Sequence, residues 1–386
     1  MRIFRTNFDS FCLHNTKALP KGCELCTEGK KVVLFITGLC QRRCAYCPLS
    51  WKRAYLDKIW ANEKECKNIR DALKETALSN AAGAGITGGD PLLVLERTLK
   101  YTRALKKHFG KTFHIHIYLP TDNVTPQALH KLKTAGIDEV RFHPKFLQQN
   151  LIEEISKIAA ARRFFSRSQV GCEIPAFPDK LEETKRFVDA VQSYIGFLNI
   201  NELEAGDSNT VFISRHYKLR DDYIVRGSKE AALKLLSYIA TKHYKPKVHF
   251  CTASTKSNYQ FRNRLRRRII NIAGPYDMVN DYILLRAALY SDELKPGFDY
   301  EKKLSKITAS QKTHLYKQLR KKRHKLLRKL KLKPEMLKLD SERQRLLTSI
   351  EIAQKNSEEI KEEGISPAIV EELPTADMLQ LSLVWL

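Results

Sequence analysis

The sequence contains no apolar run long enough to cross a membrane and no apolar segment near its start. A membrane-spanning helix needs about 20 consecutive apolar residues, and the longest runs here are far shorter. Met1–Arg5 is followed by polar residues, so we expect no secretory signal peptide. The nine cysteines are odd in number and gather in short stretches, which disfavours a disulfide framework. These absences predict a cytoplasmic protein with no membrane partner.

Acidic residues are also scarce relative to basic ones. The chain of 386 residues has 68 Lys and Arg against 43 Asp and Glu, a formal net charge of +25. Hydrophobic residues make up 43% of the sequence, which is enough for a packed core, so disorder is not expected. The length predicts either one large domain with an extension or two domains.

Three cysteines follow a predicted buried strand. The apolar run Val32–Ile36 has the composition of a strand, and Cys40, Cys44 and Cys47 come directly after it. The carboxyl end of such a strand is where barrels and other α/β proteins build their sites. Most iron–sulfur clusters take four thiolates, so three thiolates indicate a cluster with one open iron. A zinc knuckle is the weaker alternative, because structural zinc sites have four ligands.

This spacing, with Tyr46 just before the last cysteine, resembles that of the radical S-adenosylmethionine (radical SAM) superfamily. The resemblance implies a [4Fe–4S] cluster on the three cysteines, with its open iron bound to S-adenosylmethionine. It also implies that an electron from the cluster breaks the C–S bond of the sulfonium. The products are methionine and a 5′-deoxyadenosyl radical, which abstracts hydrogen from a substrate. An electron donor such as ferredoxin or flavodoxin is the implied partner.

A second stretch is similar to another motif of the same superfamily. Ala84–Pro91 is predicted to be a strand followed by a tight turn that contains Gly88, Gly89 and Asp90. The resemblance implies that this turn holds the methionine amino group, with Asp90 where glutamate is commoner. Glycine lets the backbone approach a ligand closely. We therefore expect these three residues, together with Tyr46, to bind the cofactor.

Alternating strand and helix patterns from residue 31 to about residue 250 predict a parallel sheet. After the first two strands, four more are predicted at His114–Leu119, Asp138–Phe142, Gln169–Ile174 and Phe197–Leu203. Amphipathic stretches lie between them at 92–108, 126–134, 146–161 and 181–194. Right-handed crossovers curl such a sheet in one direction. The α/β pattern matches the partial (β/α)6 TIM-like barrel that the resemblance implies for residues 31–250, after a cysteine-containing segment of residues 1–30.

Polar residues near the carboxyl ends of barrel strands face the ligand. Arg141 and His143 end the fourth predicted strand, Glu173 lies in the fifth and Asn201 in the sixth. We take His143 and Glu173 as candidate catalytic residues, and Arg141 and Asn201 as candidates for binding the cofactor. Each of them alone is more often a core or surface residue in an ion pair, and their shared position at one sheet edge favours the functional interpretation.

Three further cysteines have the spacing of metal ligands. Cys23 and Cys26 form a CxxC pair, which is half of a site. Cys251 ends a strand-like segment and is the candidate third ligand, with His249 or Cys12 as the fourth. Zinc and a second iron–sulfur cluster both suit these residues. Reduced cysteines packed as small apolar residues are the alternative.

The sequence after residue 250 becomes strongly basic. Lys302–Lys338 holds fifteen Lys and Arg residues against one acid, Glu335, and its leucines recur at helical spacing. A returning helix over 341–363 and a terminal strand over 379–386 complete the predicted, mainly helical extension of residues 251–386. A basic helix attracts polyanions by counterion release, so tRNA or another RNA is a candidate partner. A solvated arm that adds solubility is the alternative.

Within the superfamily, the sequence resembles mostly archaeal proteins related to pyruvate formate-lyase activating enzymes. The similarity covers Cys23–Ser50, Gly85–Leu93 and Gly136–Pro144. We therefore predict a radical SAM enzyme that abstracts hydrogen from an unidentified substrate, with tRNA among the candidates. One alternative is modification of a protein, as by a glycyl-radical-enzyme activase. Another is a non-catalytic iron–sulfur protein that senses redox state or binds RNA.

Overall fold

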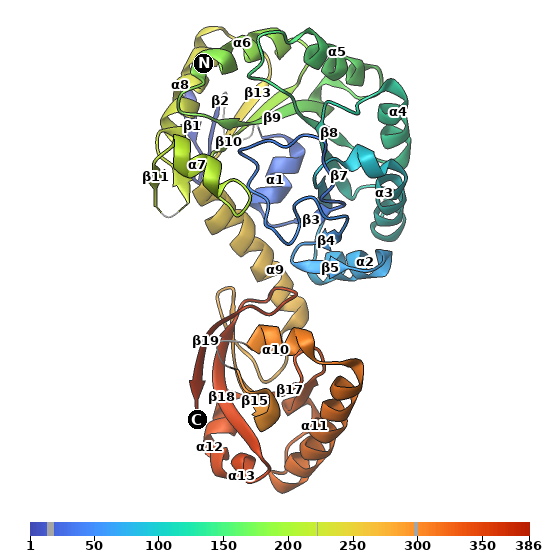
Figure 1. Cartoon of the computed structure of the whole chain (residues 1–386), viewed down its shortest axis with the longest axis vertical. Helices are drawn as coiled ribbons and strands as arrows, with labels where there is room; N and C mark the ends of the chain where they lie inside the picture. The colour runs from blue at the N-terminus through green and yellow to red at the C-terminus, as the bar shows by residue number, and fades with distance from the viewer. Residues whose placement is uncertain (14–18, 222, 297–299) are drawn as a thin grey trace. The chain divides into compact units, whose positions relative to one another are not determined.

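The computed structural model describes residues 1–13, 19–221, 223–296 and 300–386 (Figure 1). The chain divides into two compact units, Met1–Arg267 and Arg268–Leu386. The boundary falls within helix α9 (Arg262–Ile272), later than the expected position near residue 250. The reason is that the first turn of α9 is bound to the first unit. The Asn263 side-chain amide donates to the Thr27 carbonyl oxygen at 2.7 Å.

Seven parallel strands form the centre of the first unit. In spatial order they are β3 (Lys31–Phe35), β6 (Gly83–Thr87), β7 (His114–Pro120), β8 (Glu139–His143), β9 (Val170–Ala176), β10 (Phe197–Glu202) and β13 (Lys247–Cys251). The first six confirm the strands that the sequence predicts. The seventh is the strand-like segment that ends at Cys251.

Short antiparallel strands extend both edges of this sheet. Strands β4 (Ile59–Ala61) and β5 (Lys64–Cys66) continue it beyond β3, and β2 (Phe11–Leu13) and β1 (Ile3–Arg5) continue it beyond β13. The result is an open sheet of 11 strands rather than a closed ring. Each edge strand has three residues, too few for a period-two pattern to be recognised.

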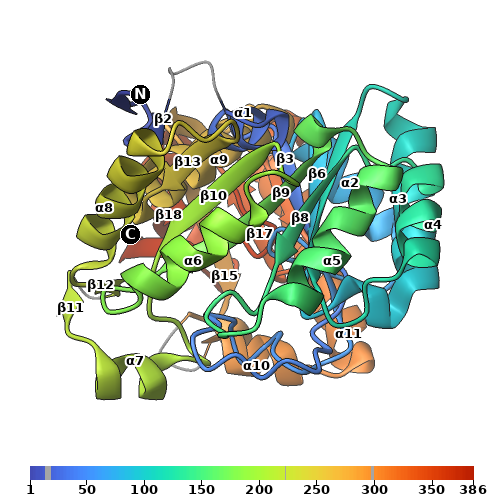
Figure 2. The same ribbon diagram turned by 90° about the horizontal axis from the view of Figure 1, so that it is seen from above.

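Helices cover the outer side of the curved sheet, as Figure 2 shows for α3 to α6. They are α2 (Ile69–Leu78), α3 (Leu95–Phe109), α4 (Pro126–Ala135), α5 (Ile152–Ala160), α6 (Leu181–Val191) and α8 (Ser228–Thr241). Between β10 and α8 lie α7 (Thr210–His216) and a hairpin of β11 (Leu219–Arg220) and β12 (Ile224–Val225). The four predicted amphipathic helices are confirmed by α3 to α6.

The barrel strands alternate between apolar side chains that face the helices and polar ones that face the interior. On β8, Val140 and Phe142 are fully buried in the apolar core, whereas Arg141 and His143 line an internal cavity. Successive side chains of a strand point to opposite faces. Every second residue of the strand therefore lies on the inner face, and on β8 these residues are polar.

A short helix, α1 (Lys21–Thr27), lies inside the curve of the sheet (Figure 1). The Gly22 amide donates to Glu139 at 3.3 Å, and a Cβ atom on Gly22 would lie 2.4 Å from the Arg141 guanidinium. Glycine at this position thus permits the close approach of α1 to β8. The CxxC pair, Cys23 and Cys26, lies on one side of this helix.

The second unit is built on a six-stranded antiparallel sheet. Its strands are β14 (Met278–Asn280), β15 (Ile283–Ser291), β16 (Lys338–Asp340), β17 (Arg345–Thr348), β18 (Ile365–Glu372) and β19 (Gln380–Trp385). Its helices are the end of α9, α10 (Tyr300–Lys306), α11 (Ala309–Lys329), α12 (Ile350–Lys355) and α13 (Ser357–Lys361). Strand β19 confirms the predicted terminal strand, and α11 confirms the predicted basic helix.

The predicted returning helix over 341–363 is wrong. Strand β17 occupies its first part, with all four residues buried between β15 and β16. Helix α12 begins only after Ser349, whose hydroxyl accepts from the Ile352 amide at 3.2 Å. In the sequence, the apolar residues Leu346 and Leu347 would suit either a helix or a strand. The segment forms a strand because its backbone pairs with β15, which is distant in the sequence.

Candidate active site

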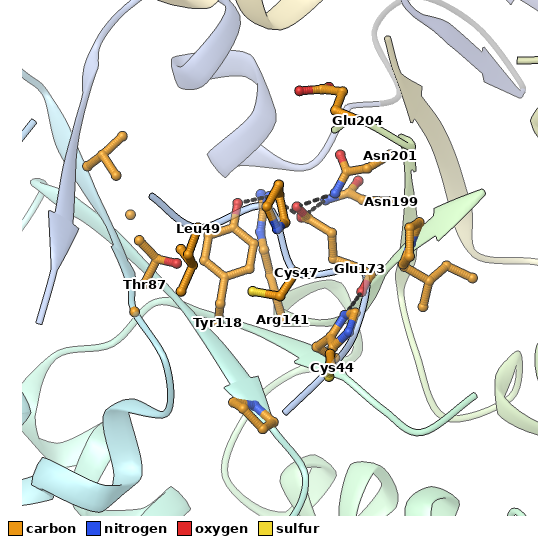
Figure 3. A pocket seen from close by; sticks show the side chains of 18 of the residues that line it. Cys44, Cys47, Leu49, Thr87, Tyr118, Arg141, Glu173, Asn199, Asn201 and Glu204 are labelled. Atoms are coloured by element: carbon orange, nitrogen blue, oxygen red, sulfur yellow. Dashed lines mark hydrogen bonds and ion pairs between the residues drawn. The ribbon is translucent and has the colours of Figure 1, made fainter. Parts of the chain in front are cut away.

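A cavity of about 510 Å³ lies inside the barrel and is lined by side chains from the inner strands. The loop after β3, the turn after β6 and helix α1 complete its walls. The sequence assigns fourteen residues to catalysis, cofactor binding or metal binding, and all of them except Asp90 line this cavity. Of the two alternatives for a fourth ligand of the second metal site, His249 lines the cavity and Cys12 does not. Figure 3 shows Cys44 and Cys47 from the loop close to Arg141 and Glu173 from the strands.

The three thiols of the loop after β3 are partly exposed and all line the cavity. Burial raises the pKa of Cys40 and that of Cys47, the latter to about 11, so a metal must displace their protons to bind. No three potential ligand side chains in the described residues converge on one ion. The ligands of an iron–sulfur cube bind different irons, so this donor set fits a cluster better than a single ion.

The turn after β6 packs against the backbone of the cysteine loop. The Asp90 amide donates to the Leu39 carbonyl oxygen at 2.7 Å. A Cβ atom on Gly89 would lie 2.1 Å from the same oxygen. Gly88 and Gly89 both line the cavity. The turn therefore positions the segment that leads into Cys40 and leaves backbone open to a ligand.

The Asp90 side chain has a different place from the one expected. It is only 1% exposed, and it is outside the cavity lining. One carboxylate oxygen accepts from the Leu92 amide at 2.9 Å, and the other accepts from the Asn123 side chain at 2.7 Å. Aspartate is one methylene shorter than glutamate, and this shorter side chain is held at the base of the turn. It joins the loops that follow β6 and β7.

A hydrogen-bonded network on the inner face surrounds Glu173 (Figure 3). Arg141 and Asn199 each donate to one carboxylate oxygen at 3.1 Å, and Asn201 donates to the other at 2.9 Å. Burial alone would raise the pKa of Glu173, but Arg141 and the two amides lower it. Glu173 is therefore an ionised carboxylate whose two oxygens are already engaged.

His143 connects the cysteine loop to this network. Its Nδ1 atom lies 2.9 Å from the Glu173 carbonyl oxygen, and its Nε2 atom lies 2.9 Å from the Tyr46 hydroxyl. Because a carbonyl only accepts, Nδ1 carries the proton and Nε2 accepts from Tyr46. Desolvation lowers the pKa of His143, and burial raises that of Tyr46. Both groups are thus neutral.

Comparison with known proteins decides the family. The family model of the radical SAM superfamily matches residues 34–191. A curated protein of Methanocaldococcus jannaschii, named as a glycyl-radical enzyme activating enzyme, is 38% identical over 292 residues. The match covers 74% of this chain and 77% of that protein. The chain belongs to the radical SAM superfamily.

Two solved structures of radical SAM enzymes were also found. Coproporphyrinogen III oxidase (HemN) from Escherichia coli has a TM-score of 0.36 at 11% identity, covering 59% of this chain and 58% of its own. The methyltransferase TsrM from Kitasatospora setae has a TM-score of 0.35 at 12% identity, covering 50% and 40%. The chain therefore spans less than two thirds of the length of either structure.

Family membership confirms the predicted enzyme class and its cofactors. The protein is a radical SAM enzyme, which uses a [4Fe–4S] cluster and S-adenosylmethionine. The archaeal relative also agrees with the predicted similarity to activating enzymes. Among the described residues, no helix is both long enough and apolar enough to cross a membrane.

Arg42 anchors the loop that carries Cys40, Cys44 and Cys47, which we call the radical SAM loop, and no motif in the sequence marks this arginine. Its side chain is 7% exposed and forms ion pairs with Asp122 and with Glu154, the latter at 3.7 Å. It also donates to the His143 carbonyl oxygen. An arginine in a loop resembles a surface residue, and only its distant partners show that it is part of the core.

We expect Arg42→Met to destabilise the radical SAM loop and the barrel around it. The substitution keeps much of the volume but leaves the buried Glu154 without its cation and Asp122 with Lys145 as its only recorded ion-pair partner in the described residues. Removing one partner of a buried ion pair typically costs about 3 kcal/mol. The measurement is the free energy of unfolding in urea, followed together with bound iron. Arg42→Lys, which keeps the charge but loses the planar fork, should show a smaller loss; equal stability of all three proteins would contradict this role.

Proposed function

We propose that this radical SAM enzyme abstracts a hydrogen atom from a polar substrate bound in the barrel cavity. The observation that carries the proposal is the common cavity, which brings the three loop thiols together with the Glu173 network. When bound, the [4Fe–4S] cluster supplies the electron that cleaves S-adenosylmethionine. Formation of 5′-deoxyadenosine by the anaerobically reconstituted protein tests it.

Residues of the cysteine loop and of the glycine turn would bind the cluster and the cofactor. Cys40, Cys44 and Cys47 hold the cluster, and the backbone at Gly88 and Gly89 admits the methionine end of the cofactor. A glycine-lined backbone is suited to this, because no side chain keeps the ligand away.

The polar groups deeper in the cavity orient the remaining parts of the ligands. Tyr46, Arg141 and Asn201 would contact the cofactor. His143 is neutral, and Glu173 is held ionised by Arg141 with both carboxylate oxygens already accepting hydrogen bonds. We assign both to positioning the reacting groups, with hydrogen-atom transfer replacing acid–base chemistry.

A second candidate substrate is a protein that carries a glycyl radical. It is supported by the name of the relative that is 38% identical to this chain. The experiment is incubation with a glycyl-radical enzyme of the same source under reducing, anaerobic conditions. A protein-based glycyl radical detected by electron paramagnetic resonance would support this candidate, and its absence would leave the other substrates.

RNA is a third candidate, supported by four cations on one side of α11. Lys317, Arg320, Lys321 and Arg328 are all exposed, and no acidic partner is recorded for them in the described part of the chain. Their spacing of three, four and eleven residues places them on one helix face. We call these four residues the basic stripe. The opposite face of α11 carries leucines buried against the sheet.

Other basic residues of the run 302–338 have structural tasks. Arg323 donates to the Leu337 and Pro334 carbonyl oxygens, the first at 2.5 Å, and Lys322 donates to the Gly364 carbonyl oxygen at 2.7 Å. Charge reversal at these two positions would disturb the fold of the second unit. A test of RNA binding must therefore use the basic stripe.

We expect Lys317→Glu, Lys321→Glu and Arg328→Glu together to weaken binding of bulk tRNA. Binding releases counterions at each phosphate that a cation neutralises, so the loss of three contacts reduces this release. The slope of log affinity against log salt should therefore fall in magnitude by about three. Such contacts position without reading sequence, so all tRNAs should lose affinity similarly. Binding is measured at several salt concentrations by fluorescence anisotropy.

The matched control carries the same change of charge on another exposed helix face. Lys100, Arg103 and Lys107 lie on α3 at comparable spacing and are exposed. Their reversal to glutamate should leave the salt slope nearly unchanged if the basic stripe is the binding surface. Equal loss in both variants would show a general effect of net charge, and no loss in the stripe variant would leave the stripe as a solubilising face.

A further inference from the structure

Four potential metal ligands line the barrel cavity apart from the radical SAM loop. Cys23 and Cys26 are three residues apart on α1, so they lie on the same side of that helix. His249 and Cys251 are two residues apart on β13, so both face the interior. All four line the same cavity, and they come from segments more than 220 residues apart in the sequence.

His249 has an environment that is unusual for an imidazole. Its side chain is 1% exposed, and neither ring nitrogen has a hydrogen-bond partner among the described residues. A buried polar group left without a partner costs about 1–3 kcal/mol. A metal at this position would satisfy one of the two nitrogens.

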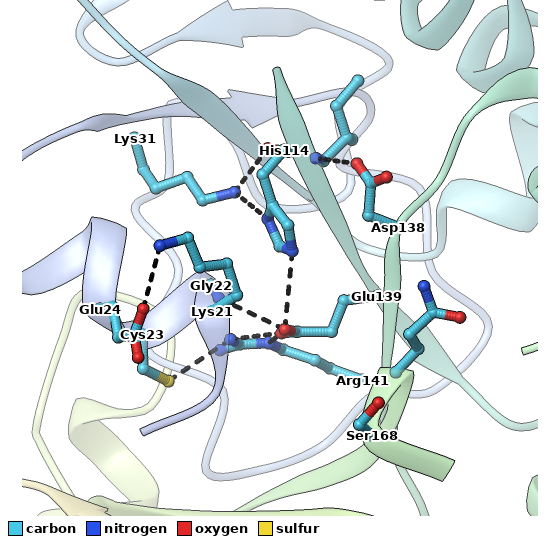
Figure 4. Close-up of polar contacts among 12 residues, drawn as sticks. Lys21, Gly22, Cys23, Glu24, Lys31, His114, Asp138, Glu139, Arg141 and Ser168 are labelled. Carbon is cyan, nitrogen blue, oxygen red and sulfur yellow. Dashed lines mark hydrogen bonds and ion pairs between the residues drawn. The ribbon is translucent and has the colours of Figure 1, made fainter. Parts of the chain in front are cut away.

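Cations and hydrogen-bond donors surround the three thiols. Arg141 donates to the Cys23 sulfur at 3.4 Å (Figure 4), and Gln260 donates to the Cys251 sulfur at 3.4 Å. Donors of this kind stabilise thiolate ligands and tune the potential of iron–sulfur clusters.

We propose that Cys23, Cys26, His249 and Cys251 hold a second iron–sulfur cluster. The three thiols line one cavity together with His249. Cys12 is buried on β2 outside the cavity lining, so His249 is the fourth ligand rather than Cys12. The site does not depend on the proposed substrate or on the reaction at the radical SAM loop.

The arrangement favours a cluster over a zinc ion. A structural zinc ion needs four ligands at about 2.0–2.3 Å from one point. In the described residues, no three such side chains converge on one point. The same holds for Cys40, Cys44 and Cys47, which the proposed function assigns to a [4Fe–4S] cluster.

The test begins with the loop variant in which Cys40, Cys44 and Cys47 are alanine. Reconstituted anaerobically with iron and sulfide, this variant should retain about four iron atoms and matching acid-labile sulfide per chain. Adding Cys23→Ser and Cys26→Ser should remove them. The matched control adds Cys66→Ser and Cys172→Ser instead, which replaces two buried thiols outside the cavity and should leave iron and sulfide in place.

Elemental analysis makes each result decisive. Zinc without sulfide in the loop variant would overturn the cluster assignment, and the absence of both metals in a protein with wild-type circular dichroism would overturn the site.

A second measurement, on the protein with all its cysteines, tests the proposal even if the serine variants fail to fold. His249→Cys should shift one of two reduction potentials to a lower value, because imidazole ligation raises the potential of a cluster; a single unshifted potential would contradict the proposal. The wild-type assay for 5′-deoxyadenosine is independent of all these readouts, so failure here is distinct from failure of the proposed function.

Discussion

Replacement of Cys40, Cys44 and Cys47 by alanine is expected to reduce 5′-deoxyadenosine formation to the level without enzyme. These thiols line the cavity and are the proposed ligands of the cluster. Without them we expect no iron to be held beside the glycine turn, so no electron would reach the sulfonium. The measurement is chromatography of the nucleoside products after anaerobic reaction with a strong reductant. Of the changes considered for this chain, this one has the largest expected effect.

The control for this result replaces cysteines that have no access to the cavity. Cys66 and Cys172 are buried, and neither lines it, so their alanine variants should form 5′-deoxyadenosine at close to the wild-type rate. Cleavage at the wild-type rate by the loop variant would show that the cofactor binds elsewhere. Iron that remains in the loop variant does not contradict this prediction, because the proposed second cluster does not use these three cysteines.

The inner face of the barrel could be predicted because strand periodicity is local. Arg141 and His143 alternate with Val140 and Phe142 within five residues, and this pattern already separates the cavity side from the helix side. The glycine turn and the cysteine loop could be predicted for a similar reason, since each is a contiguous motif. The structure adds that their backbones touch, through Leu39.

Helix α1 could not be placed in the barrel from the sequence. It has seven residues, which is too short for a reliable amphipathic period. Its position depends on contacts with β8, 117 residues later, such as the one between Gly22 and Glu139. The same limitation applies to Arg42, whose partners lie on the loops and helices beyond β7. Long-range pairing of this kind leaves no local signal.

Strand β17 illustrates the opposite error, in which a local signal is misread. Residues 341–363 contain apolar positions that fit a helical period, and Ser349 offers a helix cap. The chain instead buries Arg345–Thr348 as a strand that pairs with β15, and Arg345 forms a buried ion pair with Glu372 of β18 at 2.6 Å. A buried ion pair between segments this far apart in the sequence cannot be inferred from periodicity.

Gly89→Val is expected to weaken binding of S-adenosylmethionine about 100-fold and to lower the content of the loop cluster as well. The new Cβ would lie 2.1 Å from the Leu39 carbonyl oxygen, so the turn and the loop must separate by about 1 Å, and a misplacement of that size can cost 100-fold. Leu39 directly precedes Cys40, so the same movement displaces a cluster ligand. Calorimetry measures the affinity, and iron analysis measures the cluster.

The control for Gly89→Val must separate local displacement from general loss of stability. Gly110 ends α3 with a φ of 90°, and no atom lies within 4 Å of the position of its Cβ. Gly110→Val therefore strains the backbone far from the cavity lining without pressing on a neighbour. It should lower the melting temperature while the affinity for S-adenosylmethionine and the iron content stay at the wild-type values. If Gly89→Val behaved in the same way, the turn would have only a structural task, and the methionine end of the cofactor would have to be held by other residues of the cavity.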